Sequence, residues 1–375
     1  MRSGEEILPG RFVIVSMSNL FISTYLASAR QDLCERLSKD YGFKIFHYYP
    51  EIATKDALAW KNEYSFRNNP LEVSSLFGKY YARHLEELVG IEHPRLVIIQ
   101  EFSLIAIQLL LLRKKYGFKL VSMCDDSMNM IGGNDFSWTH TLARKILPRF
   151  LDDIILNSPE TAVWYREHFG KGEVLPIIPD EKVFRRRLEA AYVRVPALRE
   201  RISPDGKKVI LFVGRAVALK NIPTLMRACL PLKDKARLVI VGSGEKLDEL
   251  KSLDLQLGLG AYFAGECFGE ELMGYYQLAD VFCLPSTQEA FGSVVGEALM
   301  AGCPVAVSSH CGARVLVNGD NGLIIEPMDV DGLTSALARL LGRVSLRNGA
   351  PIRDNLSPLG FSACFDVLIN NLQCL

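Results

Sequence analysis

Short apolar runs that alternate with longer segments of helical period are the feature that most constrains the fold of this chain. The runs are apolar throughout, which is typical of strands covered on both faces in a parallel sheet. The expected strands are 12–17, 43–48, 96–99, 119–124, 154–157, 209–213, 237–241, 262–264, 281–284, 305–308 and 322–325. The alternation occurs twice, so we predict an α/β fold of two Rossmann-like, doubly wound domains facing across a cleft.

Helical segments fill the intervals between these strands. The expected helices are 25–39, 71–89, 102–116, 159–169, 223–229, 245–255, 270–278, 291–301 and 330–341. Pro176 and Pro179 interrupt the pattern, because proline is excluded from central strands. We therefore predict an N-terminal domain over 1–180, a C-terminal domain over 181–355, and a last helix over 356–375 that could return to the N-terminal domain.

Composition excludes some classes of partner. Lys plus Arg and Asp plus Glu each number 43, so there is no basic excess of the kind that binds nucleic acid. The nine cysteines include no CxxC pair, and we expect buried free thiols in a reducing compartment. The N-terminus lacks a secretory signal pattern, and the longest apolar run, 104–112, is shorter than the ~20 residues of a membrane span. We expect a cytoplasmic protein.

Segment 139–150 mixes apolar residues with lysine and arginine. One interpretation is an interdomain helix whose cations extend to solvent. The other is a peripheral contact with the inner face of a membrane, near a lipid-linked acceptor.

Two loops follow buried strands of the second half, where ligands bind in open α/β sheets. The first contains Gly214 and Arg215, with Lys220 five residues after the arginine. Two cations at this spacing suit a diphosphate, although taken alone they are also explained as solvated loop residues. The second is Gly242-Ser243-Gly244, which could cradle a nucleotide. Leu247 stands where a dinucleotide-binding motif has its third glycine, so this loop is equally well explained as a tight connection.

A third loop, after strand 281–284, carries the sharpest signal. Glu289 lies at the end of the strand, and Gly292 and Ser293 begin a helix whose free N–H groups favour an anion. Glu297 lies further along the same helix. Two carboxylates placed in this way can bracket a ligand with many hydroxyl groups. The alternative is a capping glutamate followed by an exposed one, but the apolar residues after Glu297 favour a partnered carboxylate.

Segment 209–341 resembles the nucleotide-binding domain of retaining glycosyltransferases of the GT-B fold, in family four (glycosyl transferases group 1). The family's pair of glutamates matches Glu289 and Glu297, and its Gly-Arg loop with a following lysine matches the loop at Gly214. Segment 279–286 and the Asn321-Gly322 pair match two further motifs.

The resemblance implies a role for each matching residue. Arg215 and Lys220 would hold the donor diphosphate, and Glu289 would hold the transferred sugar. The implied donor-binding residues are Gly214, Gly242, Cys267, Phe291, Gly292, Ser293 and Glu297, with the base near Gly242 and Cys267 and the ribose on Glu297. The leaving phosphate would help to deprotonate the acceptor, so catalysis rests on positioning and on charge stabilisation.

The resemblance also implies the partners. The donor would be a UDP- or GDP-sugar, the acceptor a glycan or lipid-linked molecule, and the product a surface polysaccharide or glycolipid. We expect no cofactor, with the nucleotide sugar as co-substrate. We also expect no metal, because Asp329 of Asp329-Val330-Asp331 is explained as the N-cap of a helix.

The first half departs from the family pattern. The loop expected after the first strand, 16–20, lacks the family's glycine pair, and Asp125 stands where relatives have a histidine. We predict that Asp125 is catalytic and that the acceptor side comprises Ser16, Ser18, Asn19 and Asp126, although the two adjacent aspartates could equally form a turn. Arg314 occupies a position where many relatives have glutamate.

Two other functions remain open. A GT-B-fold sugar-nucleotide epimerase or phosphorylase would need its own catalytic set between the domains. A non-catalytic sugar-nucleotide-binding protein would tolerate Glu297→Ala without loss of glycan synthesis.

Overall fold

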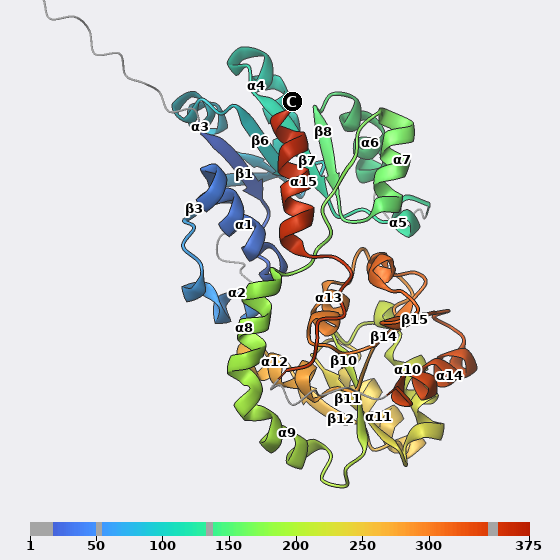
Figure 1. The fold of residues 1–375 in the computed structure, drawn as a ribbon. Coiled ribbons are helices and arrows are strands. Elements are labelled where there is room, and N and C mark those ends of the chain that lie inside the picture. The colour runs from blue at the N-terminus through green and yellow to red at the C-terminus, as the bar shows by residue number, and fades with distance from the viewer. Residues whose placement is uncertain (1–17, 50–54, 133–137, 344–351) are drawn as a thin grey trace, which may run out of the picture.

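The computed structural model describes residues 18–49, 55–132, 138–343 and 352–375. They form two α/β domains, drawn one above the other in Figure 1, each around a parallel sheet. The N-terminal sheet has the order β3-β2-β1-β6-β7-β8-β9 and the C-terminal sheet β12-β11-β10-β13-β14-β15. In both, the first strand lies in the middle and the chain winds outward on each side, so the predicted doubly wound fold is confirmed.

The N-terminal sheet consists of β1 (Asn19–Ser23), β2 (Phe43–His47), β3 (Asn68–Pro70), β6 (Leu96–Gln100), β7 (Lys119–Cys124), β8 (Asp153–Leu156) and β9 (Glu173–Val174). Its helices are α1 (Ser28–Tyr41), α2 (Lys55–Ala59), α3 (Leu85–Glu92), α4 (Leu104–Tyr116), α5 (Met128–Gly132), α6 (Trp138–Ile146) and α7 (Pro159–Phe169). Leu20, Ile22, Val97 and Ile99 are fully buried at its centre, as expected for strands covered on both faces.

Two expectations for this domain are wrong. The strand that pairs with β2 and β6 is Asn19–Ser23, so the loop after the first strand is 24–27 and not 16–20; the expected strand 12–17 lies outside the described residues. Segment 71–82 is not helical but forms the antiparallel hairpin β4 (Val73–Leu76) and β5 (Lys79–Ala82). Its two-residue turn, Phe77-Gly78, has positive φ at both positions, 50° and 72°, which is the geometry of a tight hairpin.

The C-terminal sheet matches the prediction within one residue at every strand end. It comprises β10 (Lys208–Val213), β11 (Ala236–Val241), β12 (Tyr262–Gly265), β13 (Val281–Leu284), β14 (Val305–Ser308) and β15 (Gly322–Ile325). The covering helices are α10 (Ile222–Cys229), α11 (Leu247–Leu257), α12 (Gly269–Leu278), α13 (Ser293–Met300) and α14 (Val330–Leu341). The strands after β10 are first added on one side of it (β11, β12) and then on the other (β13, β14, β15), and ligands bind at such a topological switch point.

The chain passes between the domains twice. Helices α8 (Glu181–Ala191) and α9 (Val195–Ile202) pack against α12 of the C-terminal domain. Helix α15 (Phe361–Gln373) runs back to the N-terminal domain (Figure 1). There Phe365 packs on Tyr41 with ring centroids 5.7 Å apart, and Asp366 pairs with Arg36 at 3.0 Å.

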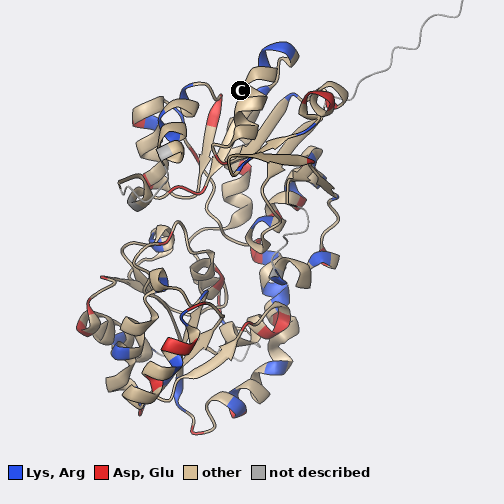
Figure 2. Cartoon of the chain, turned by 180° about the vertical axis from the view of Figure 1, so that it is seen from behind, with Lys and Arg blue, Asp and Glu red and all other residues tan. Residues whose placement is uncertain are grey.

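The distribution of charge on the surface and the state of the cysteines agree with what the composition predicts. Acidic and basic residues are interspersed over both domains (Figure 2). All nine cysteines are free thiols and seven of them are buried, as predicted. Within the described residues, no helix has both the length and the apolar character needed to cross a bilayer.

Candidate functional site

A cavity of about 260 Å³ lies between the two domains, at the carboxyl ends of their central strands. We call it the interdomain cavity. From the predicted residues it brings together Asp125, Gly214, Lys220, Glu289, Phe291, Gly292 and Ser293. The N-terminal domain adds residues that sequence reasoning missed, namely Thr24, Tyr25, Ala27, Ala29, Arg30 and Gln100. Each domain thus supplies one wall.

The C-terminal wall is built around an ion pair. The ammonium of Lys220, which follows β10, contacts the carboxylate of Glu289, which follows β13. Their side chains are only 15% and 17% exposed, so the pair is weakly screened by solvent. A cation and a carboxylate side by side can bind the charged and the hydroxyl parts of one ligand.

The N-terminus of helix α13 completes this wall. Its N-cap is Gly292, which has φ 89°. A Cβ there would lie 2.9 Å from both the Cys311 sulfur and the Leu284 Cδ2 atom, so a larger residue would displace the loop. The backbone N–H groups that begin α13 therefore lie at the cavity, where they favour an anion.

Four predicted donor-side residues do not line the interdomain cavity. Arg215 is exposed, and Glu297 accepts a 2.7 Å hydrogen bond from the Tyr276 hydroxyl. Gly242 packs against the backbone of the loop at Gly214. Cys267 is buried, and burial raises the pKa of its thiol to about 11. The roles that the family resemblance implies for these four residues stay predictions.

The N-terminal wall contains a second ion pair. Asp125, directly after β7, is paired with the guanidinium of Arg30 on α1. Arg30 is 8% exposed, so the carboxylate is held in a fixed position by a largely desolvated partner. The Oε1 atom of Gln100 accepts hydrogen bonds from the Thr24 backbone N–H at 3.2 Å and hydroxyl at 3.1 Å, which fixes the loop after β1.

The structure contradicts three of the four acceptor-side expectations. Asp126 is buried, and its carboxylate binds the Arg144 guanidinium through two bonds of 2.6 and 2.7 Å. Ser18 and Asn19 lie at the amino end of the N-terminal sheet, where Ser18 donates to Glu92 at 3.0 Å. Parallel strands bring their carboxyl ends to the opposite edge, so these two residues are remote from the cavity. Ser16 lies outside the described residues.

The Arg144–Asp126 ion pair corrects the interpretation of segment 139–150 as an interdomain helix with solvent-exposed cations. Helix α6 belongs to the N-terminal domain, and Arg144 is buried against Asp126 instead of extending to solvent. Leu142 and Ile146 of this helix are 46% and 42% exposed.

Arg314, which stands where many relatives have glutamate, forms a contact between the two domains. Its guanidinium pairs with Glu160, in the first turn of α7, at 2.5 Å. The Asp329 carboxylate accepts a 2.9 Å hydrogen bond from the Gly332 N–H and caps α14, as predicted. No group of three or more His, Cys, Asp or Glu with metal-binding geometry occurs in the described part of the chain.

Glu101 is a further residue that the sequence did not reveal. It follows β6 with φ 65°, a rare conformation for a residue other than glycine. Its Oε1 atom accepts a 3.1 Å hydrogen bond from the Asp125 N–H. Burial, and then the neighbouring carboxylates of Asp125 and Asp126, raise its pKa to about 8, against the opposing effects of the Asp125 N–H hydrogen bond and of Arg30. Strain and a raised pKa at one residue are typical of functional sites.

Glu101→Gln should therefore change how stability depends on pH. A carboxyl whose pKa is raised on folding stabilises the protein while protonated, and that stability is lost as pH rises from the unfolded value through about 8. The melting temperature of the variant minus that of the wild type should therefore be several degrees higher at pH 8.5 than at pH 5.5. An equal difference at both pH values, measured by differential scanning calorimetry, would contradict the raised pKa.

Comparisons with known proteins bear on this site. Residues 196–348 match the family described as Glycosyl transferases group 1. A GDP-mannose-dependent alpha-mannosyltransferase of Mycolicibacterium smegmatis is 40% identical over 142 residues, covering 37% of this chain and 35% of that protein. An uncharacterized glycosyltransferase of Methanocaldococcus jannaschii is 39% identical over 142 residues, covering 36% of each. The matched segments span little more than a third of either relative.

Solved structures resemble the whole chain. A sucrose-phosphate synthase from Thermosynechococcus elongatus has a TM-score of 0.71 at 20% identity, covering 96% of this chain and 100% of that one. Anabaena HepE in complex with UDP-glucose has a TM-score of 0.73 at 17% identity, with the same coverage. At this identity the likeness establishes the fold. The chain thus has the two-domain GT-B fold, and its residues 196–348 match the glycosyl transferases group 1 family.

Proposed function

We propose that this protein is a retaining glycosyltransferase that moves a sugar from a nucleotide-diphosphate sugar to a hydroxyl acceptor. The observation that carries the proposal is the Lys220–Glu289 pair, which stands at the switch point of a glycosyl transferases group 1 domain and faces Asp125 of the other domain. A ligand between these walls would contact a cation, a carboxylate and a helix N-terminus at once.

In the proposed reaction, Lys220 holds the diphosphate, assisted by Arg215. Glu289 and the N–H groups that begin α13 hold the transferred sugar, and Glu297 holds the ribose. The acceptor oxygen bonds to the anomeric carbon as the bond to the diphosphate breaks, and the acceptor proton passes to the departing phosphate. No protein nucleophile is required, so positioning and charge stabilisation supply the rate enhancement.

The acceptor belongs to the N-terminal side of the interdomain cavity. Asp125 lies there, paired with Arg30 and with 32% of its side chain exposed, so its carboxylate is positioned to orient a hydroxyl group. We propose that the donor is a UDP- or GDP-sugar, as the relatives' names suggest for those proteins. Synthesis of a surface polysaccharide or glycolipid, in the cytoplasm or at the inner face of the membrane, is the setting that we propose for this activity.

A thermal-shift screen with UDP-, GDP- and ADP-sugars tests the proposal, because a ligand that binds only the folded state raises its melting temperature. We expect a UDP- or GDP-sugar to stabilise the protein. With that donor, the product should keep the anomeric configuration, and the rate should be unchanged in EDTA. Epimerisation of the donor without an acceptor would contradict the transferase activity. An inverted product would contradict retention of configuration, and a strict need for Mg²⁺ or Mn²⁺ would contradict metal-independent catalysis.

A further inference from the structure

A second, larger cavity of about 510 Å³ lies within the N-terminal domain, beside the interdomain cavity. We call it the apolar cavity. Five segments enclose it: the loop after β1, the loop after β2, the tip of the β4-β5 hairpin, segment 101–107 at the start of α4, and helix α6. Its size is that of a small-molecule site. None of the functional residues predicted from the sequence lines it, so its occupant has to be inferred from its chemistry.

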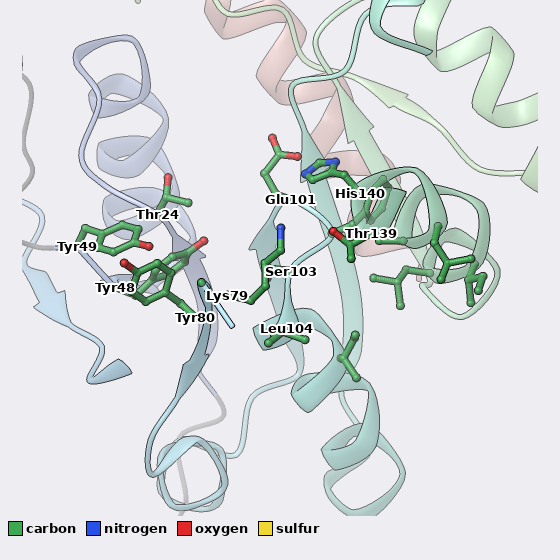
Figure 3. Close-up of a pocket in the computed structure, with 17 residues that line it drawn as sticks. Thr24, Tyr48, Tyr49, Lys79, Tyr80, Glu101, Ser103, Leu104, Thr139 and His140 are labelled. Atoms are coloured by element: carbon green, nitrogen blue, oxygen red, sulfur yellow. The ribbon is translucent and has the colours of Figure 1, made fainter. Parts of the chain in front are cut away.

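One side of the apolar cavity is aromatic. Tyr48, Tyr49 and Tyr80 gather there (Figure 3), with ring centroids 5.0 Å apart for the first two and 4.8 Å for the last two. Tyr80 comes from the hairpin that the sequence failed to predict. The first pair is tilted and the second packs edge to face, and rings packed in this way present broad apolar surface at a fixed position.

The opposite side is aliphatic. Helix α6 contributes Leu142, Ala143 and Ile146, and α4 contributes Ile107. Ile107 is 39% exposed, comparable with Leu142 and Ile146. A sugar chain bound against this side would set its hydroxyl groups next to aliphatic side chains that cannot bond to them, at a cost in free energy. The polar lining residues, among them Glu101, Ser103, Thr139 and His140, can bond only to a polar part of the ligand. An alkyl or aryl group would instead remove this apolar surface from water.

The apolar cavity adjoins the site of the proposed reaction. Thr24 lines both cavities. Glu101 lines the apolar cavity, while its carboxyl oxygen accepts the N–H of Asp125, which lines the interdomain cavity. A molecule in the apolar cavity whose polar end lies at Thr24 would present that end to the interdomain cavity.

We propose that the acceptor carries an alkyl or aryl group, which fills the apolar cavity between Tyr49 and Ile146 while the acceptor hydroxyl passes Thr24 into the interdomain cavity. The inference rests on the proposed function and narrows its acceptor to a molecule with one polar and one apolar end. A free polysaccharide end does not have this form, whereas a lipid-linked sugar does.

Matched pairs of methyl and octyl glycosides of glucose, galactose and mannose test the inference. Binding is measured by titration calorimetry, with the octyl compounds kept below the concentration at which they form micelles. We expect at least one octyl glycoside to bind about tenfold more tightly than its methyl counterpart. Ala143→Trp, which fills the apolar cavity, should remove this difference. Lys145→Trp, on the exposed face of the same helix, should preserve it.

Three outcomes separate the possibilities. Equal affinities within every pair, or an octyl preference that survives Ala143→Trp, overturn the inference. If Ala143→Trp does not fold, Ile146→Asn replaces it and should weaken octyl binding in the same way. Failure of every nucleotide sugar to raise the melting temperature, with the octyl preference intact, would contradict the proposed function and leave an apolar-ligand site of another kind.

Discussion

Alanine in place of Lys220 is expected to lower kcat/KM for the productive nucleotide sugar by well over tenfold. The ammonium lies at the interdomain cavity with 15% of the side chain exposed. Loss of one charge-assisted stabiliser of a departing group costs ~2–4 kcal/mol. The variant also leaves the Glu289 carboxylate without its lysine, so a diphosphate would approach an uncompensated negative charge.

A double-mutant cycle separates these two effects. Glu289→Gln, Lys220→Ala and the double variant are assayed with saturating acceptor. If Lys220 acts on the diphosphate itself, the double variant stays as poor in donor binding as Lys220→Ala. If the lysine only neutralises Glu289, the double variant recovers. Arg227→Ala, on the exposed face of α10, is the control for a lost cation in the same domain. Unchanged kinetics in Lys220→Ala would contradict the diphosphate role.

The C-terminal domain was predictable because its strands are buried on both faces. The runs 281–284, 305–308 and 322–325 coincide with β13, β14 and β15. Such strands leave uninterrupted apolar runs, and the polar residues that follow them must lie at the carboxyl edge of the sheet. This is why Lys220 and Glu289 could be placed at one site although 69 residues separate them.

The N-terminal domain was less predictable because periodicity does not reveal pairing. Residues 12–17 and 19–23 are both apolar enough for a strand, and only the pairing with β2 and β6 shows that Asn19–Ser23 forms one. The loop that lines the interdomain cavity therefore begins at Thr24, and Gln100 and Arg30 lie beside it in the same wall. Asp126 looked functional beside Asp125, but its partner Arg144 is 18 residues away and the contact depends on tertiary packing.

The prediction of a helix over 71–89 was wrong because of the local sequence. The Phe77-Gly78 turn allows segments 73–76 and 79–82 to pair, and Tyr80 and Tyr81 favour a strand. Since Tyr80 lines the apolar cavity, this error hid one wall of the acceptor site that we infer. Glu101 was hidden for a different reason, because its strain and raised pKa arise from contacts with Asp125 and Asp126.

Gly242→Ala is expected to produce the largest loss of stability among single methyl additions at the nucleotide side. A Cβ at this position would lie 2.0 Å from the Gly214 carbonyl oxygen and 2.9 Å from its carbon, both backbone atoms. The residue also has φ 133°, which side chains rarely adopt. Backbone strain and overpacking together should cost about 2–6 kcal/mol.

The position of the clash makes this variant informative about function as well. Gly214 lines the interdomain cavity and its N–H donates to the Val241 carbonyl at 3.0 Å, so relief of the clash has to separate the loops after β10 and β11. Donor affinity should fall together with the unfolding free energy. Gly258→Ala is the matched control: φ is 55° and a Cβ would meet nothing within 4 Å, so only the conformational cost of about 1–2 kcal/mol applies.

Urea unfolding and a nucleotide-sugar titration of the two variants provide the measurement. Gly258→Ala should keep wild-type donor affinity despite its lower stability, because the cap of α11 is not part of the cavity wall. Gly242→Ala should lose both. Equal losses of stability in the two variants would show that the loop at Gly214 moves away from the added methyl group at little cost in free energy. Its contact with Gly242 would then not be what holds the cavity wall in place.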